Sequence, residues 1–278
     1  MTVRDEVEAN RSSLPAAERR VAEVVLRAPE SVAFGTVALV AAHAETSGAT
    51  VVRFGNRLGY EGFQGLQAAV QQELAGRLRP AAERIRERAK GDVVGRTLTV
   101  ESANLHTTLT TLDRADFETA VALLSARGGR VAIAPGGASH GVARQLADEL
   151  AVLRPGVELV WGSPMATAAA LAGLEARDVV VAVDLRRYDS ALLDAVSVAG
   201  GGASIIAVTD GVLSPLAERA AVAFAVAGEG AGPFDSHIGA LALFNALLAG
   251  VATRLRTSAT KRIDAIESAW ATVGALRT

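Results

Sequence analysis

Apolar residues follow two different patterns along this chain, and the change falls near residue 128. Before it, apolar residues recur at helical spacing, most regularly in a long segment from about Gly62 to Leu78 that ends before Pro80. After it, short β-rich apolar runs alternate with helical segments. Apolar strands that alternate with helices predict a parallel sheet with helices on both faces.

The second part predicts a doubly wound α/β fold with a five-stranded parallel sheet in the order 2-1-3-4-5. The strands are expected at residues 130–134, 158–161, 178–183, 204–209 and 222–226, and the helices between them at 139–153, 166–174, 190–199 and 215–220. Helices are also expected before the sheet, at 15–28, 100–112 and 117–124, and after it, at 238–256 and 258–276. The fold class is therefore an all-α N-terminal domain followed by this α/β domain.

The segment from Ser47 to Gly59 predicts one helix with clear ends. Ser47 is a good N-cap because its hydroxyl can accept a bond from the first turn, and Gly59 suits the left-handed residue after a helix. A shorter helix at 36–44 precedes it, and only Glu45 and Thr46 separate the two. A left-handed Glu45 would cost about 1 kcal/mol. Helix, short turn and helix together predict a helix-turn-helix unit.

The second of these helices has an apolar stripe and a polar face. Small residues at its start would allow close approach to a DNA major groove, and forked Arg and Asn side chains would present donors to bases and phosphates. The candidate DNA-binding residues are Ser47, Gly48, Ala49, Thr50, Arg53, Asn56 and Arg57. The alternative is a small helical bundle whose polar face meets only water.

The N-terminal part resembles the RpiR family of bacterial transcription regulators, which join a helix-turn-helix domain to a sugar-isomerase-type (SIS) domain. The matching blocks are residues 14–22, 29–34, 49–54 and 58–63. Pro15 and Glu45 depart from the family, which often has a capping Thr or Ser and a Gly at these places. The resemblance implies that double-stranded DNA is a partner.

Length and composition allow two domains of ordinary size. We expect a DNA-binding domain at 1–80, a linker rich in Arg and Glu at 81–91, and an effector-binding and dimerisation domain at 92–278. Cysteine is absent, the four histidines show no paired ligand spacing, and neither a metal nor a cofactor is predicted. The charged N-terminus and the lack of an apolar run of about 18 residues predict a cytoplasmic protein without a membrane partner.

Charge restricts the kind of DNA binding to expect. The whole chain has a net charge of −2, and residues 1–80 hold nine Arg against nine Asp and Glu. A DNA-binding domain usually carries a positive surface. Because the acids gather in the first helices, we expect modest non-specific affinity and a specificity that depends on few contacts.

The segment after the first predicted strand is a candidate ligand site. Pro135-Gly136-Gly137-Ala138-Ser139-His140-Gly141 forms a glycine-rich turn that leads into a helix. Backbone N–H groups at such a turn bind phosphates, and Ser139 can add a hydroxyl. A tight turn without a ligand is an equal alternative. A dinucleotide site is set aside because Trp161-Gly162-Ser163 stand where an acid is needed after the second strand.

Residues 130–256 resemble the SIS domain, in which the position of Ser139 and a Ser-x-Ser-Gly-x-Thr loop after the third strand hold the phosphate of a phosphosugar. Here that loop is Asp184-Leu185-Arg186-Arg187-Tyr188-Asp189, and no position keeps the expected residue. Two guanidiniums would instead favour a small anion such as a sugar acid. The alternative is internal pairing, with Asp184 and Asp189 neutralising both arginines under a Tyr188 lid. The effector candidates are Gly137, Ser139, His140, Asp184, Arg186, Arg187 and Tyr188.

The leading hypothesis is a non-enzymatic, sequence-specific DNA-binding regulator whose SIS-like domain senses a small, anionic, sugar-related metabolite, either a sugar phosphate or a sugar acid. One recognition helix per chain and apolar C-terminal helices predict a homodimer or homotetramer on an inverted-repeat operator. One alternative is a phosphosugar isomerase, for which His237 and Glu149 are the candidate bases. Another is a regulator with a ligand-free SIS domain used only for oligomerisation.

Overall fold

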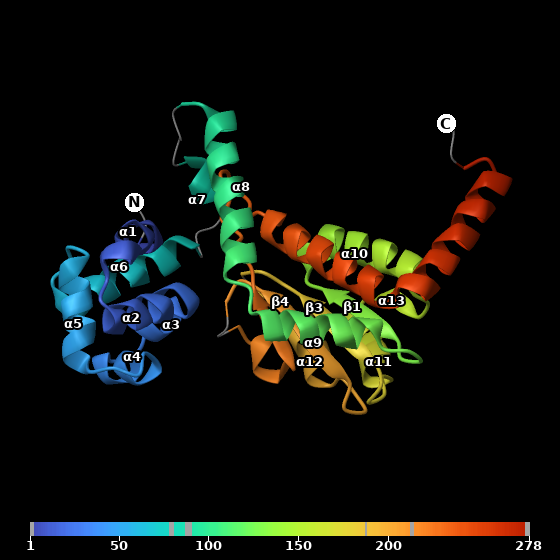
Figure 1. Cartoon of the computed structure of the whole chain (residues 1–278), viewed down its shortest axis with the longest axis horizontal. Helices are drawn as coiled ribbons and strands as arrows, with labels where there is room; N and C mark the ends of the chain where they lie inside the picture. Colours follow the sequence, from blue (N-terminus) through green and yellow to red (C-terminus); the bar gives the residue numbers. More distant parts are fainter. Residues whose placement is uncertain (1–2, 78–80, 87–90, 187, 212–213, 276–278) are drawn as a thin grey trace. The chain divides into compact units, whose positions relative to one another are not determined.

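A computed structural model describes residues 3–77, 81–86, 91–186, 188–211 and 214–275. The chain divides into two compact units, one of residues 1–84 and the other of residues 85–278, apart from residues 211–213. Figure 1 shows a helical N-terminal unit and a C-terminal unit built around a sheet. Each unit has its own hydrophobic core.

The N-terminal unit is entirely helical. Its helices are α1 (Val3–Asn10), α2 (Ala16–Arg27), α3 (Pro29–Ala33), α4 (Val37–His43), α5 (Gly48–Arg57) and α6 (Gly62–Arg77), with a 3₁₀ turn at Arg11–Ser13. Val21, Val51, Phe54 and Leu66 are buried together at its centre. The helices predicted at 15–28, 36–44, 47–59 and 62–78 are thereby confirmed to within a few residues.

Two helices of this unit were not predicted. α1 has few apolar positions among its acids, although Val3 and Val7 are buried. α3 begins at Pro29, directly after the predicted helix at 15–28, where no helix was expected. Proline is favourable at the first position of a helix because the missing N–H has no intrahelical partner there. The proline therefore starts a helix here as well as ending one.

The C-terminal unit contains one parallel sheet in the order β2-β1-β3-β4-β5, as predicted. The strands are β1 (Val131–Pro135), β2 (Val157–Leu159), β3 (Val179–Val183), β4 (Ser204–Thr209) and β5 (Val222–Ala225). Register is set by pairs such as Val131 with Val179 and Val179 with Ser204. The carboxyl ends of β1 and β3 therefore lie side by side at one edge.

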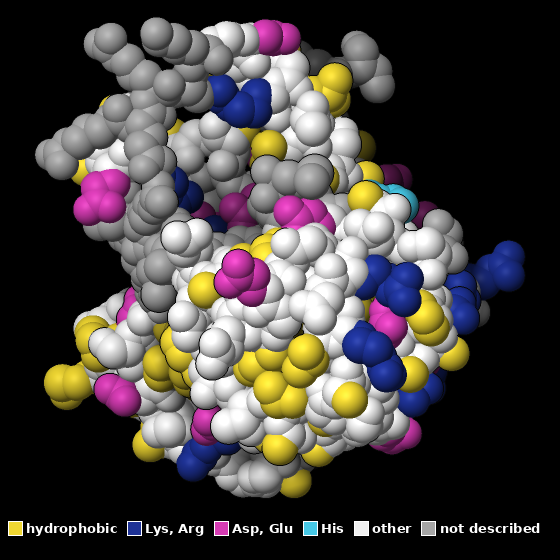
Figure 2. Space-filling view, turned by 90° about the vertical axis from the view of Figure 1, so that its left-hand side faces the viewer, with side chains coloured by type: hydrophobic (Ala, Val, Ile, Leu, Met, Phe, Trp, Pro, Cys, Tyr) yellow, Lys and Arg dark blue, Asp and Glu magenta, His cyan; other side chains and the backbone are white. Residues whose placement is uncertain are grey.

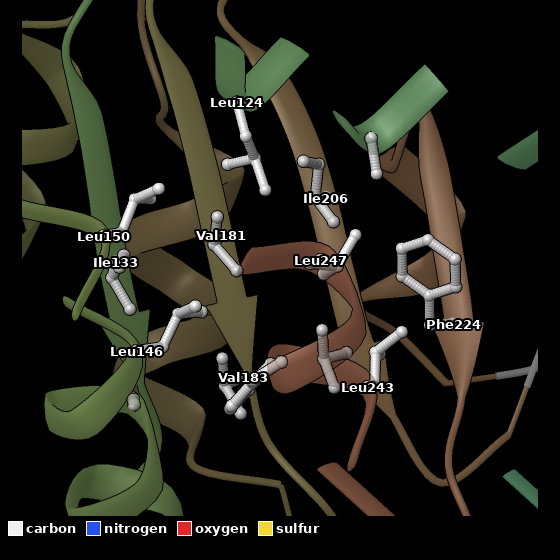
Figure 3. Close-up of a cluster of buried hydrophobic side chains, with 14 of the residues drawn as sticks. Leu124, Ile133, Leu146, Leu150, Val181, Val183, Ile206, Phe224, Leu243 and Leu247 are labelled. Atoms are coloured by element: carbon white, nitrogen blue, oxygen red, sulfur yellow. The ribbon is translucent and has the colours of Figure 1, made fainter. Parts of the chain in front are cut away.

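Helices cover both faces of this sheet (Figure 1). They are α9 (Arg114–Ser125), α10 (His140–Leu153), α11 (Pro164–Ala172), α12 (Ser190–Ser197) and α13 (Ile238–Thr272). α7 (Ala81–Arg86) and α8 (Val93–Thr110) precede them, and α8 packs against α13. Ile133, Val181 and Val183 point to one face and pack against α9, α10 and α13 (Figure 3). Ala132, Ala134 and Val180 point to the other face, toward α11 and α12. This alternation is why the buried strands are apolar throughout.

The end of the chain differs from the prediction. The helices expected at 238–256 and 258–276 are one helix, α13. Ser258 was interpreted as a boundary, but its hydroxyl donates to the carbonyl of Leu255 within the helix. Such back-bonding allows a small polar residue to stay inside a helix. The helix expected at 215–220 is only a 3₁₀ turn, Ala217–Arg219.

α8 also begins earlier than expected, at Val93 rather than at residue 100. Thr97 and Thr99 donate to the carbonyls of Val93 and Gly95 inside it. The length and composition of α13 would allow it to cross a membrane. Leu243, Phe244, Leu247 and Val251 of α13 are buried against the sheet, so it serves as a core helix.

Candidate nucleic-acid interface and effector site

The start of α5 has the geometry that the sequence predicted for it. Ser47 accepts a hydrogen bond from the N–H of Thr50 at 3.3 Å. A Cβ on Gly48 would lie 2.9 Å from Cγ1 of Val37, so the glycine allows close packing of α4 and α5. Ser47, Ala49, Arg53, Asn56 and Arg57 are exposed. Most of the predicted polar face is therefore available to a ligand.

Thr50 is the exception on this helix. It is only 4% exposed, so the expectation that it flanks the outer face is wrong. Its hydroxyl lies 3.0 Å from the Ser47 hydroxyl and accepts a bond from Nη2 of Arg53 at 3.1 Å. Thr50 therefore holds one nitrogen of the Arg53 guanidinium from the buried side of α5.

The turn between α4 and α5 is braced by a residue that sequence reasoning missed. Glu45 has the predicted left-handed conformation, with φ 46°. Arg20 of α2 donates from Nε to the carbonyl of Ala44 at 2.9 Å and from Nη2 to that of Glu45 at 3.1 Å. Charge-assisted bonds of this kind offset the strain of a non-glycine residue at this place. No local pattern links Arg20 to a turn 24 residues away.

Two predicted DNA contacts also have structural partners. Oδ1 of Asn56 accepts a bond from the N–H of Gly62 at 2.7 Å, which leaves its amide nitrogen as donor. A bidentate contact with adenine needs both groups. Nε of Arg57 lies 2.6 Å from Oε2 of Glu18, whose side chain is 5% exposed. Arg53 donates to the neutral hydroxyl of Thr50, whereas Arg57 is paired with a buried carboxylate, so Arg53 is the side chain of this face best suited to reach a base edge.

Surface charge on the side of the molecule that carries the N-terminal unit is mixed. Figure 2 shows Lys and Arg side chains gathered toward one edge of this view, with acidic and apolar side chains spread over the rest. A mixed surface of this kind agrees with the balance of nine Arg and nine acids in residues 1–80, from which modest non-specific affinity for DNA was expected.

The candidate effector site lies at the carboxyl edge of β1 and β3. After β1, Gly136 and the 3₁₀ turn Gly137–Ser139 lead directly into α10. Ser139 is fully buried, and its hydroxyl lies 3.3 Å from Nε2 of His237. His140 instead contacts Trp161, with ring centroids 4.7 Å apart and ring planes tilted by 51°. The glycine turn and Ser139 therefore lie at the predicted edge of the sheet, and His237, at the start of α13, lies next to Ser139.

The loop after β3 folds back onto this glycine turn. The carboxyl group of Asp184 is buried against Gly136, where a Cβ would overlap it. Oδ2 of Asp184 accepts a bond from the N–H of Asp189 at 2.6 Å. Oδ2 of Asp189 accepts from the N–H of Gly137 at 3.3 Å, and its Oδ1 caps α12 through the N–H of Ala191 at 2.9 Å. Burial raises the pKa of Asp184 to about 6, and the charges of Asp189 and Asp210 add to the shift.

Arg186 is paired internally, with other acids than the sequence suggested. Its side chain is 5% exposed and lies 2.6 Å from Glu229, 3.2 Å from Asp235 and 3.8 Å from Asp210. Asp184 and Asp189, the predicted partners, are engaged elsewhere. Its backbone is left-handed, with φ 32°. Arg187 lies outside the described residues. The premise of a guanidinium free to bind an anion is therefore not met at Arg186.

Tyr188 and one of the two candidate bases, His237, complete the site. The Tyr188 hydroxyl donates to Asp210 at 2.7 Å, and burial raises its pKa to about 12. Burial lowers the pKa of His237, against the opposing charge of Asp235, so its imidazole is neutral at pH 7. Glu149 is exposed on α10 and accepts a bond from Gln145, so it is not part of this edge. Within the described ranges, no group of three or more His, Asp or Glu is placed to hold a metal ion.

Both units of this chain match families of known proteins. Residues 1–77 match the helix-turn-helix domain of the rpiR family, and residues 123–250 match the SIS domain. The sugar isomerase domain of an RpiR transcription factor from Sphaerobacter thermophilus is 28% identical, with a TM-score of 0.57 over 62% of this chain and 97% of that one. A search of curated protein sequences found no match.

Two further solved structures share the fold. The NanR protein of Vibrio vulnificus, solved in complex with ManNAc-6P, is 21% identical, with a TM-score of 0.59 over 99% of each chain. A candidate sugar-phosphate isomerase from Listeria monocytogenes is 19% identical, with a TM-score of 0.50 over 59% of this chain and 90% of that one. Regulators and isomerases thus both occur among the proteins with this SIS fold.

Proposed function

The chain belongs to the RpiR family, with its helix-turn-helix and SIS domains, and from this premise we propose that it binds a specific operator and responds to a small sugar-related metabolite. The observation that carries the DNA-binding proposal is the exposed face of α5, where Arg53 stands beside the small residues Ser47 and Ala49. Small residues let the helix approach the groove, and the guanidinium can donate to a guanine edge.

Arg53→Ala tests this proposal. A bidentate contact to a base contributes about 1–3 kcal/mol of discrimination. Arg53→Ala should therefore lower the ratio of operator to non-specific affinity by about fivefold or more, measured by titration of labelled duplexes at fixed salt. Arg114→Ala, which removes the same charge from α9 in the C-terminal unit, is the control. An unchanged ratio for Arg53→Ala would exclude this face of α5 as the recognition surface.

We further propose that the protein acts as a homodimer or a larger symmetric assembly. One recognition helix per chain suits two half-sites of an inverted repeat. α8 supports this proposal, because it turns Asn104 and Thr108 inward and leaves Val94 and Leu98 79% and 68% exposed. An exposed apolar helix face marks an interaction site. It carries no charge that would suit DNA or an acidic partner, so a second copy of the same face fits it.

The effector proposal rests on the edge formed by Gly137, Ser139 and His237. In the doubly wound fold, small molecules bind at this switch point between β1 and β3. We propose that the SIS domain senses its ligand without converting it, because it is joined to a DNA-binding unit. Release of operator DNA on addition of a sugar derivative to the full-length protein would identify the effector.

A further inference from the structure

One backbone N–H of the glycine turn, that of Gly137, already has an acceptor from the protein itself. Oδ2 of Asp189 lies 3.3 Å from the N–H of Gly137, at the start of the turn that leads into α10. The same carboxylate caps α12 through Ala191. It is therefore fixed at one point by a helix start and at the other by the glycine turn.

A second carboxyl group, that of Asp184, fills the space next to Gly136 in the glycine turn. Asp184 is 3% exposed, packs against the Cα of Gly136, and binds the N–H of Asp189. The β3–α12 loop is thus joined to the β1–α10 turn by its own acids. Farther along the edge, Arg186 is surrounded by Asp210, Glu229 and Asp235, so its positive charge is already compensated.

From these contacts we propose that Asp189 is a specificity-determining residue, whose carboxylate occupies the anion position of the glycine turn and makes this SIS domain reject phosphomonoesters. The effector class that remains is a sugar derivative without a phosphate. This inference rests on the proposed function only in taking this edge as the effector site. A phosphate oxygen bound to the N–H of Gly137 would have to displace Asp189, and the dianion would lie beside two acidic side chains.

Inorganic phosphate is the probe for this proposal, because it carries the charge without any sugar. Asp189→Asn removes the charge and keeps an oxygen for the cap of α12, since Asn is also a good N-cap. By calorimetry at constant ionic strength, the full-length wild type should bind phosphate at least tenfold more weakly than Asp189→Asn. Asp189→Ser, which also retains a cap, gives a second test if the Asn variant folds poorly.

Asp113→Asn is the matched control. Asp113 caps α9 by accepting from the N–H groups of Ala115 and Asp116, so the change removes the same charge from an equivalent cap elsewhere. It should leave phosphate binding as weak as in the wild type. Equal phosphate affinity in the wild type and both Asp189 variants would overturn the proposal. Operator binding, measured in parallel, tests the proposed function separately.

Discussion

Asp184 shows how a single residue in the effector site affects stability. Its carboxyl group has an ordinary pKa of 3.8 in the unfolded chain and about 6 in the folded protein, where burial disfavours its charge. The folded state therefore holds the proton more tightly. The resulting stabilisation is fully present below about pH 4 and is lost as the pH rises through about 6. The buried Asp184 carboxylate therefore reduces the stability of the domain at neutral pH.

Asp184→Asn should relieve this cost, because the amide is neutral and its oxygen can still accept from the N–H of Asp189. We expect the free energy of unfolding at about pH 8 to rise by about 1–3 kcal/mol, and the gain to vanish near pH 4. Denaturant titrations of the wild type and variant at both pH values measure this difference. Asp113→Asn, at an exposed carboxylate, is the control; an equal gain there would mean that burial of Asp184 is not the cause.

At the scale of elements, periodicity predicted most of the fold. The apolar strands and the helices between them gave the correct sheet order, because each element buries a face and repeats apolar residues with its own period. Errors fell where a residue that often breaks helices lies within or begins one. Pro29 starts α3, and Ser258 bonds inside α13. Composition alone cannot distinguish these uses of the same residue types.

The contact between α5 and α2 depends on the pair of Arg57 and Glu18. Glu18 is buried, so removing Arg57 leaves its carboxylate without this cation. Arg57→Ala should lower the free energy of unfolding of the N-terminal unit by about 1–3 kcal/mol, whereas Arg53→Ala should change it little. Thermal melts of both variants measure this contrast. Glu18→Ala in the Arg57→Ala background should recover part of the lost stability. A melting temperature of Arg57→Ala equal to that of the wild type would contradict the prediction.

At the scale of the whole molecule, the sequence predicted which segments form each site better than it predicted their pairings. It placed the glycine turn, Ser139 and the loop of Asp184 and Tyr188 at one edge, because strand order brings the ends of β1 and β3 together. It did not predict that Glu229 and Asp235 pair with Arg186, more than 40 residues away. Ion pairs between distant segments leave no periodic signal, so their partners became visible only in three dimensions.

Self-association is also a property of the whole molecule, and the exposed apolar face of α8 is the surface at which we test it. Val94, Leu98, Leu105 and Leu109 lie within about 60° of one another around this helix, at 100° per residue, and all four are exposed. The interface was expected on the C-terminal helices, but among the described residues the second half of α13 exposes only one large apolar side chain, Trp270, and Val273 follows its end. α8 is therefore the better candidate for the two-fold contact.

Leu98→Lys should weaken self-association, because pairing two copies of this face would bury a new charge from each chain. By analytical ultracentrifugation, we expect the dissociation constant of the dimer to rise by about tenfold or more, equivalent to about 1.4 kcal/mol. Ala103→Lys, which adds the same charge to an exposed position on another side of α8, should leave it unchanged. Binding to an inverted-repeat operator should weaken with Leu98→Lys, while affinity for a single half-site stays the same. A wild-type dimer in the Leu98→Lys variant would exclude α8 from the interface.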